Sequence, residues 1–389
     1  MNYVFSEKAG AFEGGIFAIL NDRKLAMEKQ GRKIYNLSIG TPDFKPAQHI
    51  IDAVAEAAKK PENYKYSIVD IPELVEAVIA RYKTRFGVDI TAEELMSVYG
   101  SQEGMAHIAL PLLNPGDTIL VPNPGYPIWN IGPFLCDAKT YEYPLVAEKD
   151  FLPDLQAIPE EVKKEAKVML VSYPQNPLGK TAPDSFYEEL IAFAKKYEIL
   201  IIHDNAYSDI IFDGKKGRSF LEFEGAKEVG VEFYSLSKSY NYTGARASFV
   251  VGNAEVIKNF RKVRTQIDYG MFLPVQYGAV AALTGPQDVV EENCREYQRR
   301  RDALCGGLRS IGWEMPDSEG TMFVWAPLPM GYTNSEEFCM ELLEKSGVLV
   351  VPGSSFGSLG EGYVRMALVL GEQEMAELVD AIEQSGVLK

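Results

Sequence analysis

Short runs rich in β-branched residues alternate with longer amphipathic runs between about residues 90 and 270, and this alternation limits the possible folds most. The short runs begin at Thr118, Lys167, Ile199, Val231 and Ala247. Their nearly continuous apolar character is typical of strands buried on both faces. Between two of them, residues 184–197 carry apolar side chains at helical spacing, and Asp184 is suited to cap the start of a helix. Strands that alternate with helices predict an α/β fold with a mostly parallel sheet covered on both faces.

The last third of the chain has a different pattern. A long polar helix is predicted from Pro286 to about Ser310, and the strand-like runs after it begin at Thr321, Val348 and Gly362. Further helices are predicted at about 334–346 and 372–386. An amphipathic stretch near residues 16–30 is too short to own a core and is expected to pack on this part. We therefore predict a large domain over residues 45–280 and a smaller α+β domain formed by residues 1–44 with 281–389.

Charge and composition argue against several functions. Lys plus Arg is 39 and Asp plus Glu is 55, so the formal net charge is −16, and such a surface repels nucleic acid and anionic lipid. No apolar run approaches the roughly 20 residues that span a bilayer. The N-terminus has no basic stretch followed by an apolar core. We expect a cytoplasmic protein that binds neither nucleic acid nor membrane.

Metal binding is not expected either. The four cysteines lie far apart without a C-x-x-C pair, and the three histidines stand alone, so neither type offers the spacing of a metal centre: Cys136, Cys294, Cys305, Cys339, His49, His107 and His203. The chemistry must use other groups.

The most informative segment is Tyr234-Ser-Leu-Ser-Lys-Ser-Tyr-Asn-Tyr-Thr-Gly-Ala-Arg246. It follows a predicted strand and places Lys238 among hydroxyls. Burial at the end of a strand and a nearby cation both disfavour the charged ammonium form of a lysine and so lower its pKa. The neutral amine is then free for Schiff-base chemistry. Ser235, Ser237 and Arg246 together could hold a phosphate, the arginine by two parallel hydrogen bonds. A cofactor with both an aldehyde and a phosphate is pyridoxal phosphate.

That cofactor needs an acidic partner for its pyridine nitrogen, a group near its ring hydroxyl and a second phosphate-binding element. Asp204 ends a predicted buried strand and is the candidate for the nitrogen, and Tyr207 can reach the same place. The turn before the helix that starts near Met105 presents backbone N–H groups and a hydroxyl to an anion: Gly100, Ser101, Gln102, Glu103 and Gly104. Each match alone is weak, but all lie at ends of strands of one predicted sheet, where ligands bind in open α/β folds.

With these residues, the chain resembles the fold type I pyridoxal-phosphate enzymes of the class I and II aminotransferase family over nearly its whole length. The family motif Ser-Leu-Ser-Lys-x-x-Asn-x-x-Gly-x-Arg is similar to Ser235 to Arg246. The resemblance implies that Lys238 binds the cofactor covalently, that Asp204 pairs with the ring nitrogen and that Tyr207 bonds the ring oxygen. It also implies an enzyme of amino acid metabolism and biosynthesis.

The same resemblance assigns residues that pattern alone does not reach. Asn176, in Tyr173-Pro-Gln-Asn-Pro177, bonds the ring oxygen and lies beside the substrate, and Tyr126 stacks on the ring. Arg365 grips the α-carboxylate, and Gly40 lies in a loop whose backbone approaches the substrate. Tyr66 matches a tyrosine that a neighbouring subunit contributes to the phosphate. The family therefore implies a homodimer with shared active sites.

The implied reaction is a ping-pong transfer. An L-amino acid passes its amino group to the cofactor and leaves as a 2-oxo acid, and a second 2-oxo acid takes the group up. Lys238 moves the Cα proton, and Asp204 keeps the ring cationic, an electrostatic contribution expected to dominate the protein's share of the rate.

Several segments are most similar to LL-diaminopimelate aminotransferases and their close relatives, including those beginning at Ser101, His203 and Gly285. Other positions depart from those enzymes. Asp70 and Ile71 stand where an acidic residue and a glycine generally shape the distal substrate pocket. Aspartate, alanine or aromatic aminotransferase activity is therefore an alternative within the class. A C–S β-lyase and a cofactor-binding regulator without turnover are alternatives from other classes.

Overall fold

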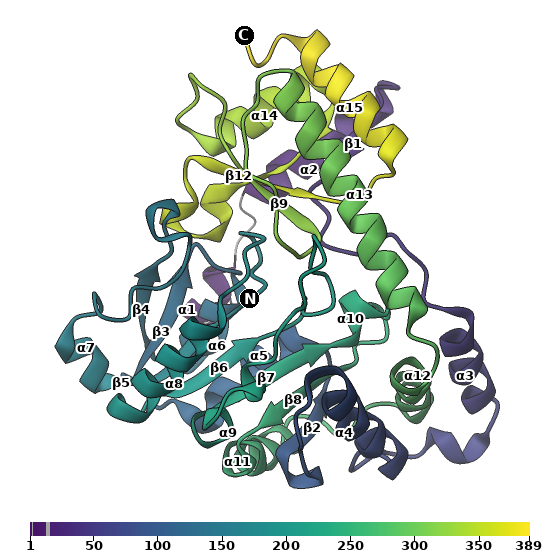
Figure 1. Ribbon diagram of the computed structural model, residues 1–389, viewed down its shortest axis with the longest axis vertical. Helices are drawn as coiled ribbons and strands as arrows, with labels where there is room; N and C mark the ends of the chain where they lie inside the picture. The colour runs from purple at the N-terminus through teal and green to yellow at the C-terminus, as the bar shows by residue number, and fades with distance from the viewer. Residues whose placement is uncertain (2, 13–15) are drawn as a thin grey trace. The chain divides into compact units, whose positions relative to one another are not determined.

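The computed structural model describes residue 1, residues 3–12 and residues 16–389. It divides into two compact units (Figure 1). The larger unit comprises Thr41–Arg299 and Ser318–Phe323, and the smaller unit comprises Met1–Gly40, Arg300–Asp317 and Val324–Lys389.

The larger unit is built on a mixed sheet. Within the described residues the strand order is β2-β8-β7-β6-β5-β3-β4, and only β8 runs antiparallel to its neighbours. The strands are β2 Leu95–Val98, β3 Thr118–Asn123, β4 Lys139–Pro144, β5 Ala166–Val171, β6 Leu200–Asp204, β7 Gly230–Ser235 and β8 Ser248–Gly252. The predicted α/β fold with a mostly parallel sheet is confirmed.

The sequence pattern located five of these strands but not β2 or β4. β4 lies at an edge of the sheet and most of its side chains are exposed. It therefore lacks the apolar run by which a buried strand is recognised. β2 is buried but only four residues long, which is too short for a periodic signal.

Helices cover both faces of the sheet. Those of the larger unit are α3 Gln48–Ala58, α4 Pro72–Phe86, α5 Ser101–Leu112, α6 Ile128–Leu135, α7 Glu160–Glu165, α8 Asp184–Tyr197, α9 Ala226–Val229, α10 Leu236–Ser239, α11 Ala254–Arg264, α12 Leu273–Thr284 and the first part of α13 Asp288–Ser310. Short 3₁₀ segments lie at Pro61–Tyr64, Ala92–Glu94, Ala147–Lys149 and Phe220–Glu222. Helix α8 has the predicted bounds, but Asp184 is its first residue, and the residue at the cap is Pro183. The expected capping by Asp184 is wrong: its carboxylate instead accepts a hydrogen bond from Arg218 Nη2 at 3.1 Å.

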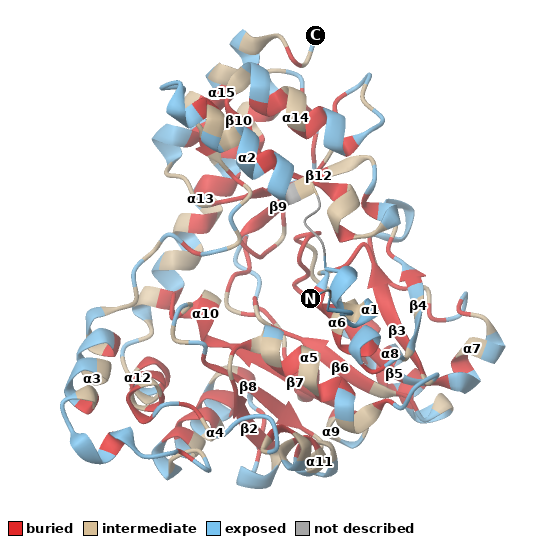
Figure 2. Cartoon of the chain, turned by 180° about the vertical axis from the view of Figure 1, so that it is seen from behind, coloured by how far each residue is buried: buried red, intermediate tan, exposed pale blue. Residues whose placement is uncertain are grey.

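Alternate residues of each central strand point to opposite faces, as strand geometry requires. Ile202 and Phe233 belong to a buried cluster that includes residues of α5, α6 and α11. Their neighbours point the other way: His203 packs on Tyr187, with ring centroids 5.7 Å apart. The strands at the centre of the sheet are therefore buried on both sides (Figure 2).

The smaller unit contains short strands flanked by helices. β1 Tyr35–Asn36 pairs in parallel with β10 Val348–Leu349, and a second sheet has the order β11-β12-β9. Its strands are β11 Val351–Pro352, β12 Tyr363–Ala367 and β9 Phe323–Pro327, of which the first residue, Phe323, belongs to the larger unit. The 3₁₀ segments are Gly353–Phe356 and Ser358–Gly360. The helices besides the end of α13 are α1 Glu7–Gly10, α2 Ile16–Lys29, α14 Ser335–Ser346 and α15 Glu372–Ser385. Helix α2 contacts α14, where Arg23 and Glu344 form an ion pair of 2.8 Å.

The compact units divide the chain at other residues than the expected domain boundaries, which stay a prediction. Residues 41–44, 281–299 and 318–323 cluster with the larger unit. The physical reasons are contacts that a linear pattern does not show. Phe44 packs edge-on against Tyr297 at 5.0 Å, and Gly320 forms a β-bridge with Ile211. Residues 2 and 13–15, within the expected 1–44 segment, lie outside the described residues.

The described residues contain neither a membrane-spanning helix nor a cluster of metal-binding side chains. None of their helices is long and apolar enough to cross a bilayer, and they contain no group of three or more His, Cys, Asp or Glu side chains placed to hold a metal ion.

Candidate active site

Three candidate groups lie at or near the carboxyl ends of strands in the larger unit's sheet. Asp204 is the last residue of β6, Lys238 lies in α10 directly after β7, and Ser101 begins α5 shortly after β2. Because β2, β6 and β7 run in the same direction, their carboxyl ends lie on the same side of the sheet. This is the place where open α/β sheets bind ligands.

The Asp204 carboxylate is buried, and its two oxygens differ in their contacts. The indole N–H of Trp129 donates to Oδ2 at 3.1 Å. Within the described residues, Oδ1 is buried and has none. Burial raises the pKa of Asp204, while the Trp129 hydrogen bond opposes that rise and the positive charge of Lys238 does so more weakly. A buried oxygen without a partner fits the protonated nitrogen of a pyridine ring.

Lys238, whose charge acts on the Asp204 carboxylate, lies near Tyr207. The Lys238 Nζ is 6.0 Å from the centre of the Tyr207 ring, and that buried ring packs edge-on against Phe323 at 5.9 Å. Helix α10 is capped by Ser235, whose Oγ accepts from the Ser237 N–H at 3.2 Å. The same Oγ accepts from the Ser248 hydroxyl at 3.0 Å. The side chain of Ser235 thus holds the turn that presents Lys238.

Gly100, Ser101 and the Arg246 guanidinium lie together where α5 begins. Gly100 has a left-handed φ of +82°, and the Arg246 guanidinium occupies the space that a side chain at position 100 would need. The Ser101 Oγ is buried with no hydrogen-bond partner among the described residues. A helix N-terminus, a guanidinium and an unpartnered hydroxyl together fit a phosphate group. The residues present therefore suit both ends of pyridoxal phosphate.

The side chains of Gln102 and Glu103 form hydrogen bonds with neighbouring residues. The Gln102 Oε1 accepts from the Tyr126 hydroxyl at 3.1 Å. Glu103 accepts from the Tyr99 N–H at 2.9 Å and the Arg264 Nε at 3.1 Å, and it contacts the ring nitrogen of His107 at 2.8 Å. Because these groups engage both carboxylate oxygens of Glu103, its contribution to an anion site would come from its backbone.

Tyr126 and Asn176 lie in two other turns of the larger unit. The Tyr126 ring packs edge-on against the Trp129 ring at 6.2 Å. Asn176 is buried in a turn that is closed by the Gly179 N–H, which donates to the Gln175 carbonyl at 2.8 Å.

Arg365 and Gly40 belong to the smaller unit. Arg365 lies on β12, is buried, and donates from Nη2 to the Ser38 carbonyl at 3.4 Å. Its guanidinium stands 4.7 Å from the centre of the Phe356 ring. The loop that leads to Gly40 is held in place because the Leu37 N–H donates to Leu349 and the Leu37 carbonyl accepts from Ala367, both at 2.8 Å.

Tyr66 is on the surface of the larger unit, with 79% of its area exposed. Its ring packs at 5.0 Å against Tyr269, and nearby Tyr64 packs at 5.4 Å against Phe272.

Two contacts of this region were missed by sequence reasoning. Trp129 follows Tyr126 by three residues, but its indole N–H gave no signal that it would reach Asp204. The Asp70 carboxylate accepts from the Ser97 N–H at 2.9 Å and also from the Ser97 hydroxyl. Each of these contacts joins residues that only the packed structure brings together.

Comparisons with known proteins identify the family of the chain. Residues 32–382 match the family described as aminotransferase class I and II. LL-diaminopimelate aminotransferase from Halothermothrix orenii is 42% identical over 374 residues, which cover 96% of each chain. The structure of substrate-bound BacF from Bacillus subtilis is 37% identical with a TM-score of 0.94, covering 98% of each chain. A probable N-succinyldiaminopimelate aminotransferase from Thermus thermophilus is 35% identical with a TM-score of 0.90, covering 95% of this chain and 100% of its own.

Two of these relatives are named as aminotransferases, one of LL-diaminopimelate and one of N-succinyldiaminopimelate. The resemblance to aminotransferases that the Lys238 motif indicated is therefore confirmed, and so are the fold type and the cofactor. The chain belongs to the class I and II aminotransferases, pyridoxal-phosphate-dependent enzymes that transfer an amino group between an L-amino acid and a 2-oxo acid.

Proposed function

We propose that Lys238, Asp204 and Tyr207 are the catalytic residues of this aminotransferase. The observation that carries the proposal is the buried Asp204 Oδ1, which has no partner among the described residues. An ionised carboxylate there binds a protonated pyridine nitrogen and keeps it charged. Bound pyridoxal phosphate supplies the electron sink that stabilises negative charge at the substrate Cα. The Lys238 amine would accept the proton from the substrate Cα and pass it to a carbon of the bound cofactor, as net amino transfer requires.

The other candidate residues orient the two reactants. Arg246, Ser101 and the N–H groups that begin α5 hold the phosphate, with Ser235, Ser237 and the Gln102–Glu103 backbone around it. Tyr126 stacks on the ring, and Tyr207 and Asn176 donate to its oxygen. Arg365 pairs with the substrate α-carboxylate, and the Gly40 backbone lies beside it.

Replacement of the lysine tests the catalytic assignment. Lys238→Ala is expected to abolish turnover and the absorbance of covalently bound cofactor, while circular dichroism shows an unchanged fold. Lys195→Ala, an exposed lysine on α8, is the control and should keep both. Transamination retained by Lys238→Ala would reject the assignment. Release of pyruvate and ammonia from a substrate with a β-sulfur leaving group would reveal lyase activity.

We propose LL-diaminopimelate or a related amino acid as the amino donor. The support comes from the relatives, since proteins named LL-diaminopimelate aminotransferase match at about 42% identity over nearly the whole chain. The segments around Ser101, His203 and Gly285 carried the same resemblance.

The second candidate is a donor without a distal ammonium, such as aspartate, alanine or an aromatic amino acid. The Asp70 contacts favour it, because both carboxylate oxygens accept hydrogen bonds from Ser97. The next residue is also held, since the Ile71 N–H donates to Gln276 Oε1 at 2.9 Å. An acid that is already paired within its own unit is a poor partner for a substrate ammonium.

A single-turnover experiment separates the two candidates. Purified holoenzyme is mixed with LL-diaminopimelate, L-aspartate, L-alanine or an aromatic amino acid, and the cofactor absorbance is followed. A rapid change with LL-diaminopimelate alone supports the first candidate, and a change only with the other donors supports the second. Asp70→Asn should slow only the diaminopimelate reaction if Asp70 binds the distal ammonium.

We infer that the active form is a cytoplasmic homodimer in which Tyr66 reaches the phosphate of the partner. The inference is supported by a band of exposed apolar side chains on the larger unit: Tyr64, Tyr66, Ile68, Val69, Ile267, Tyr269 and Phe272. Large contiguous apolar patches on a protein surface mark interaction sites.

A further inference from the structure

The larger unit contains a basic cavity that none of the candidate active-site residues lines. Its volume is about 650 Å³, and its walls are α4, residues 208–217 and the start of α13. Five lining side chains are cationic and two are acidic: Arg81, Arg85, Lys215, Lys216, Arg295, Asp209 and Glu291. This is a local excess of positive charge in a chain whose net charge is −16.

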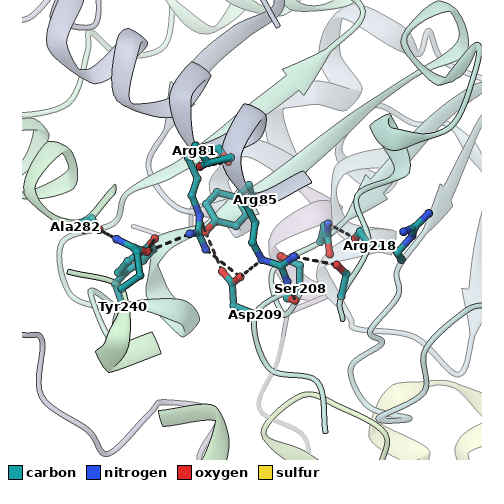
Figure 3. A network of polar contacts seen from close by, with 12 residues as sticks. Arg81, Arg85, Ser208, Asp209, Arg218, Tyr240 and Ala282 are labelled. Carbon is teal, nitrogen blue, oxygen red and sulfur yellow. Dashed lines mark hydrogen bonds and ion pairs between the residues drawn. The ribbon is translucent and has the colours of Figure 1, made fainter. Parts of the chain in front are cut away.

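The buried acid of the cavity is already neutralised. Arg81 Nη2 and Arg85 Nε approach the same oxygen of Asp209 at 3.0 and 2.9 Å (Figure 3). The other oxygen accepts from the Tyr234 hydroxyl at 2.9 Å. Burial alone raises the pKa of Asp209, but the two guanidinium groups hold it below its ordinary value. Asp209 thus offsets the charge of the arginines without repelling an anion outright.

The remaining cations are available to a ligand. Lys215 and Lys216 are exposed, lie between Gly214 and Gly217, and have no ion-pair partner among the residues that the structure describes. Arg85 makes one hydrogen bond from each of its nitrogens, to Asp209, to the Gly217 carbonyl and to the Ser208 carbonyl. Since a guanidinium has five N–H donors, its terminal nitrogens each keep one.

A buried hydroxyl of the same wall lacks a partner. Ser208 lines the cavity, and its Oγ is buried with no hydrogen-bond partner in the described part of the chain. Buried polar groups are nearly always hydrogen-bonded. An oxygen atom of a bound ligand would satisfy this one.

We propose that this cavity is a second binding site, for a small metabolite that carries two or more phosphate or carboxylate groups. A cavity of this volume falls in the range typical of small-molecule sites and exceeds what a single phosphate needs. Lys215 and Lys216 bind one anionic group, and Arg85 with Ser208 binds another. The guanidinium supplies directional hydrogen bonds and the lysines supply point charges.

The site is joined to the active site through the chain. Ser208 and Asp209 follow Tyr207 directly, and the Tyr234 hydroxyl that bonds Asp209 belongs to the residue before Ser235. A ligand that draws Arg85 from Asp209 loosens the segment that carries Tyr207. Binding is therefore expected to change the rate of the aminotransferase reaction.

Calorimetric titration of the cofactor-saturated enzyme tests the proposal, with citrate and pyrophosphate as probes at a fixed ionic strength. Saturation with cofactor keeps pyrophosphate out of the Arg246 site. The double variant Lys215→Ala/Lys216→Ala is expected to bind about tenfold more weakly, since two exposed charge pairs with the ligand are lost and each contributes modestly. Ser208→Ala should bind several-fold more weakly without any change of charge. The matched control is Lys195→Ala/Lys196→Ala, an adjacent exposed pair on α8.

Each outcome is decisive. Binding of citrate alone identifies a polycarboxylate ligand, binding of pyrophosphate alone identifies a phosphorylated one, and binding of both indicates recognition of charge and spacing. The proposal is overturned by absence of binding, by equal affinity in Lys215→Ala/Lys216→Ala and the unaltered enzyme, or by an equal loss in the control pair. The rate without probe should be the same in the Lys215/Lys216 variant and the unaltered enzyme.

Discussion

Asp204 was predicted from the local sequence, but its hydrogen bond with Trp129 is a long-range contact. The strand pattern placed it at the end of β6, and Trp129, 75 positions away, donates to one of its oxygens at 3.1 Å. A hydrogen bond to a carboxylate stabilises its ionised form. Trp129 therefore helps to keep Asp204 charged although burial favours the neutral acid.

Trp129→Phe should weaken cofactor binding about tenfold or more, because a hydrogen bond to a charged group contributes roughly 1.5–3 kcal/mol. The pKa of Asp204 is already raised, and loss of the donor raises it further, so the pH below which affinity declines should move upward. Absorbance titrations with cofactor across a pH series measure both effects.

The control for this prediction is Trp313→Phe. That indole is also buried and donates to the Pro327 carbonyl at 2.8 Å within the smaller unit. Equal cofactor affinity and pH dependence in Trp129→Phe and the unaltered enzyme would show that the Trp129 hydrogen bond has no functional weight.

At the scale of elements, the start of α5 combines a glycine with a positive φ, Gly100, and the proposed phosphate site. Gly100 and Gly116 both have a positive φ, of +82° and +85°. A side chain at position 116 would meet open space, whereas one at position 100 would overlap Arg246. Comparing alanine variants of the two glycines therefore distinguishes the free-energy cost of backbone strain from the cost of displacing the Arg246 guanidinium.

Gly100→Ala and Gly116→Ala should each lose about 1–2 kcal/mol of stability from backbone strain. Only Gly100→Ala should also lose cofactor affinity, by about tenfold or more, because Arg246 is displaced from the phosphate site. Thermal unfolding and cofactor titration provide the two readouts. A comparable affinity loss in Gly116→Ala would argue against a role for the Gly100–Arg246 contact.

The pairing of α4 with the segment after β6 is expected to depend on pH. Arg81 and Arg85 on α4 hold the pKa of Asp209 below its ordinary value despite burial. The pKa of such a carboxyl is lower in the folded protein than in the unfolded chain, where it is about 4. It therefore stabilises the folded state at pH values above about 4, and this stabilisation is lost as the pH falls through the pKa of the folded state.

Asp209→Asn should cost about 3–5 kcal/mol near neutral pH, because it leaves a buried arginine without its counter-ion. The difference from the unaltered protein should shrink as the pH falls below about 4. Urea unfolding midpoints at several pH values measure it. Asp89→Asn, which breaks the exposed Asp89–Lys83 pair of 2.7 Å, should change stability by less than about 1 kcal/mol; a similar loss there would contradict the assigned weight of Asp209.

At the scale of the whole molecule, the proposed homodimer makes Tyr66 a residue of the partner's site. The exposed Tyr66 and Lys238 of one chain then belong to different active sites. Mixed dimers offer a direct test, because closed two-fold symmetry places each residue in a defined partner site.

Lys238→Ala and Tyr66→Ala are each expected to lose most activity. After the two variants are mixed and allowed to exchange subunits, about half of the dimers are mixed, and each has one intact site. Activity should therefore return to roughly a quarter of the unaltered level. No recovery, with sedimentation showing that subunits do exchange, would mean that Tyr66 acts within its own chain or not at all.

The sequence by itself predicted the α/β architecture, five buried strands of the large sheet and the Lys238 motif, because each rests on local periodicity or on a short spacing. Tertiary structure alone decided which distant groups meet: Trp129 with Asp204, Asp70 with Ser97, and Arg81 and Arg85 with Asp209. It also decided the bounds of the compact units, through contacts such as Phe44 with Tyr297. These contacts depend on how helices and strands pack in three dimensions, and no spacing along the chain encodes them.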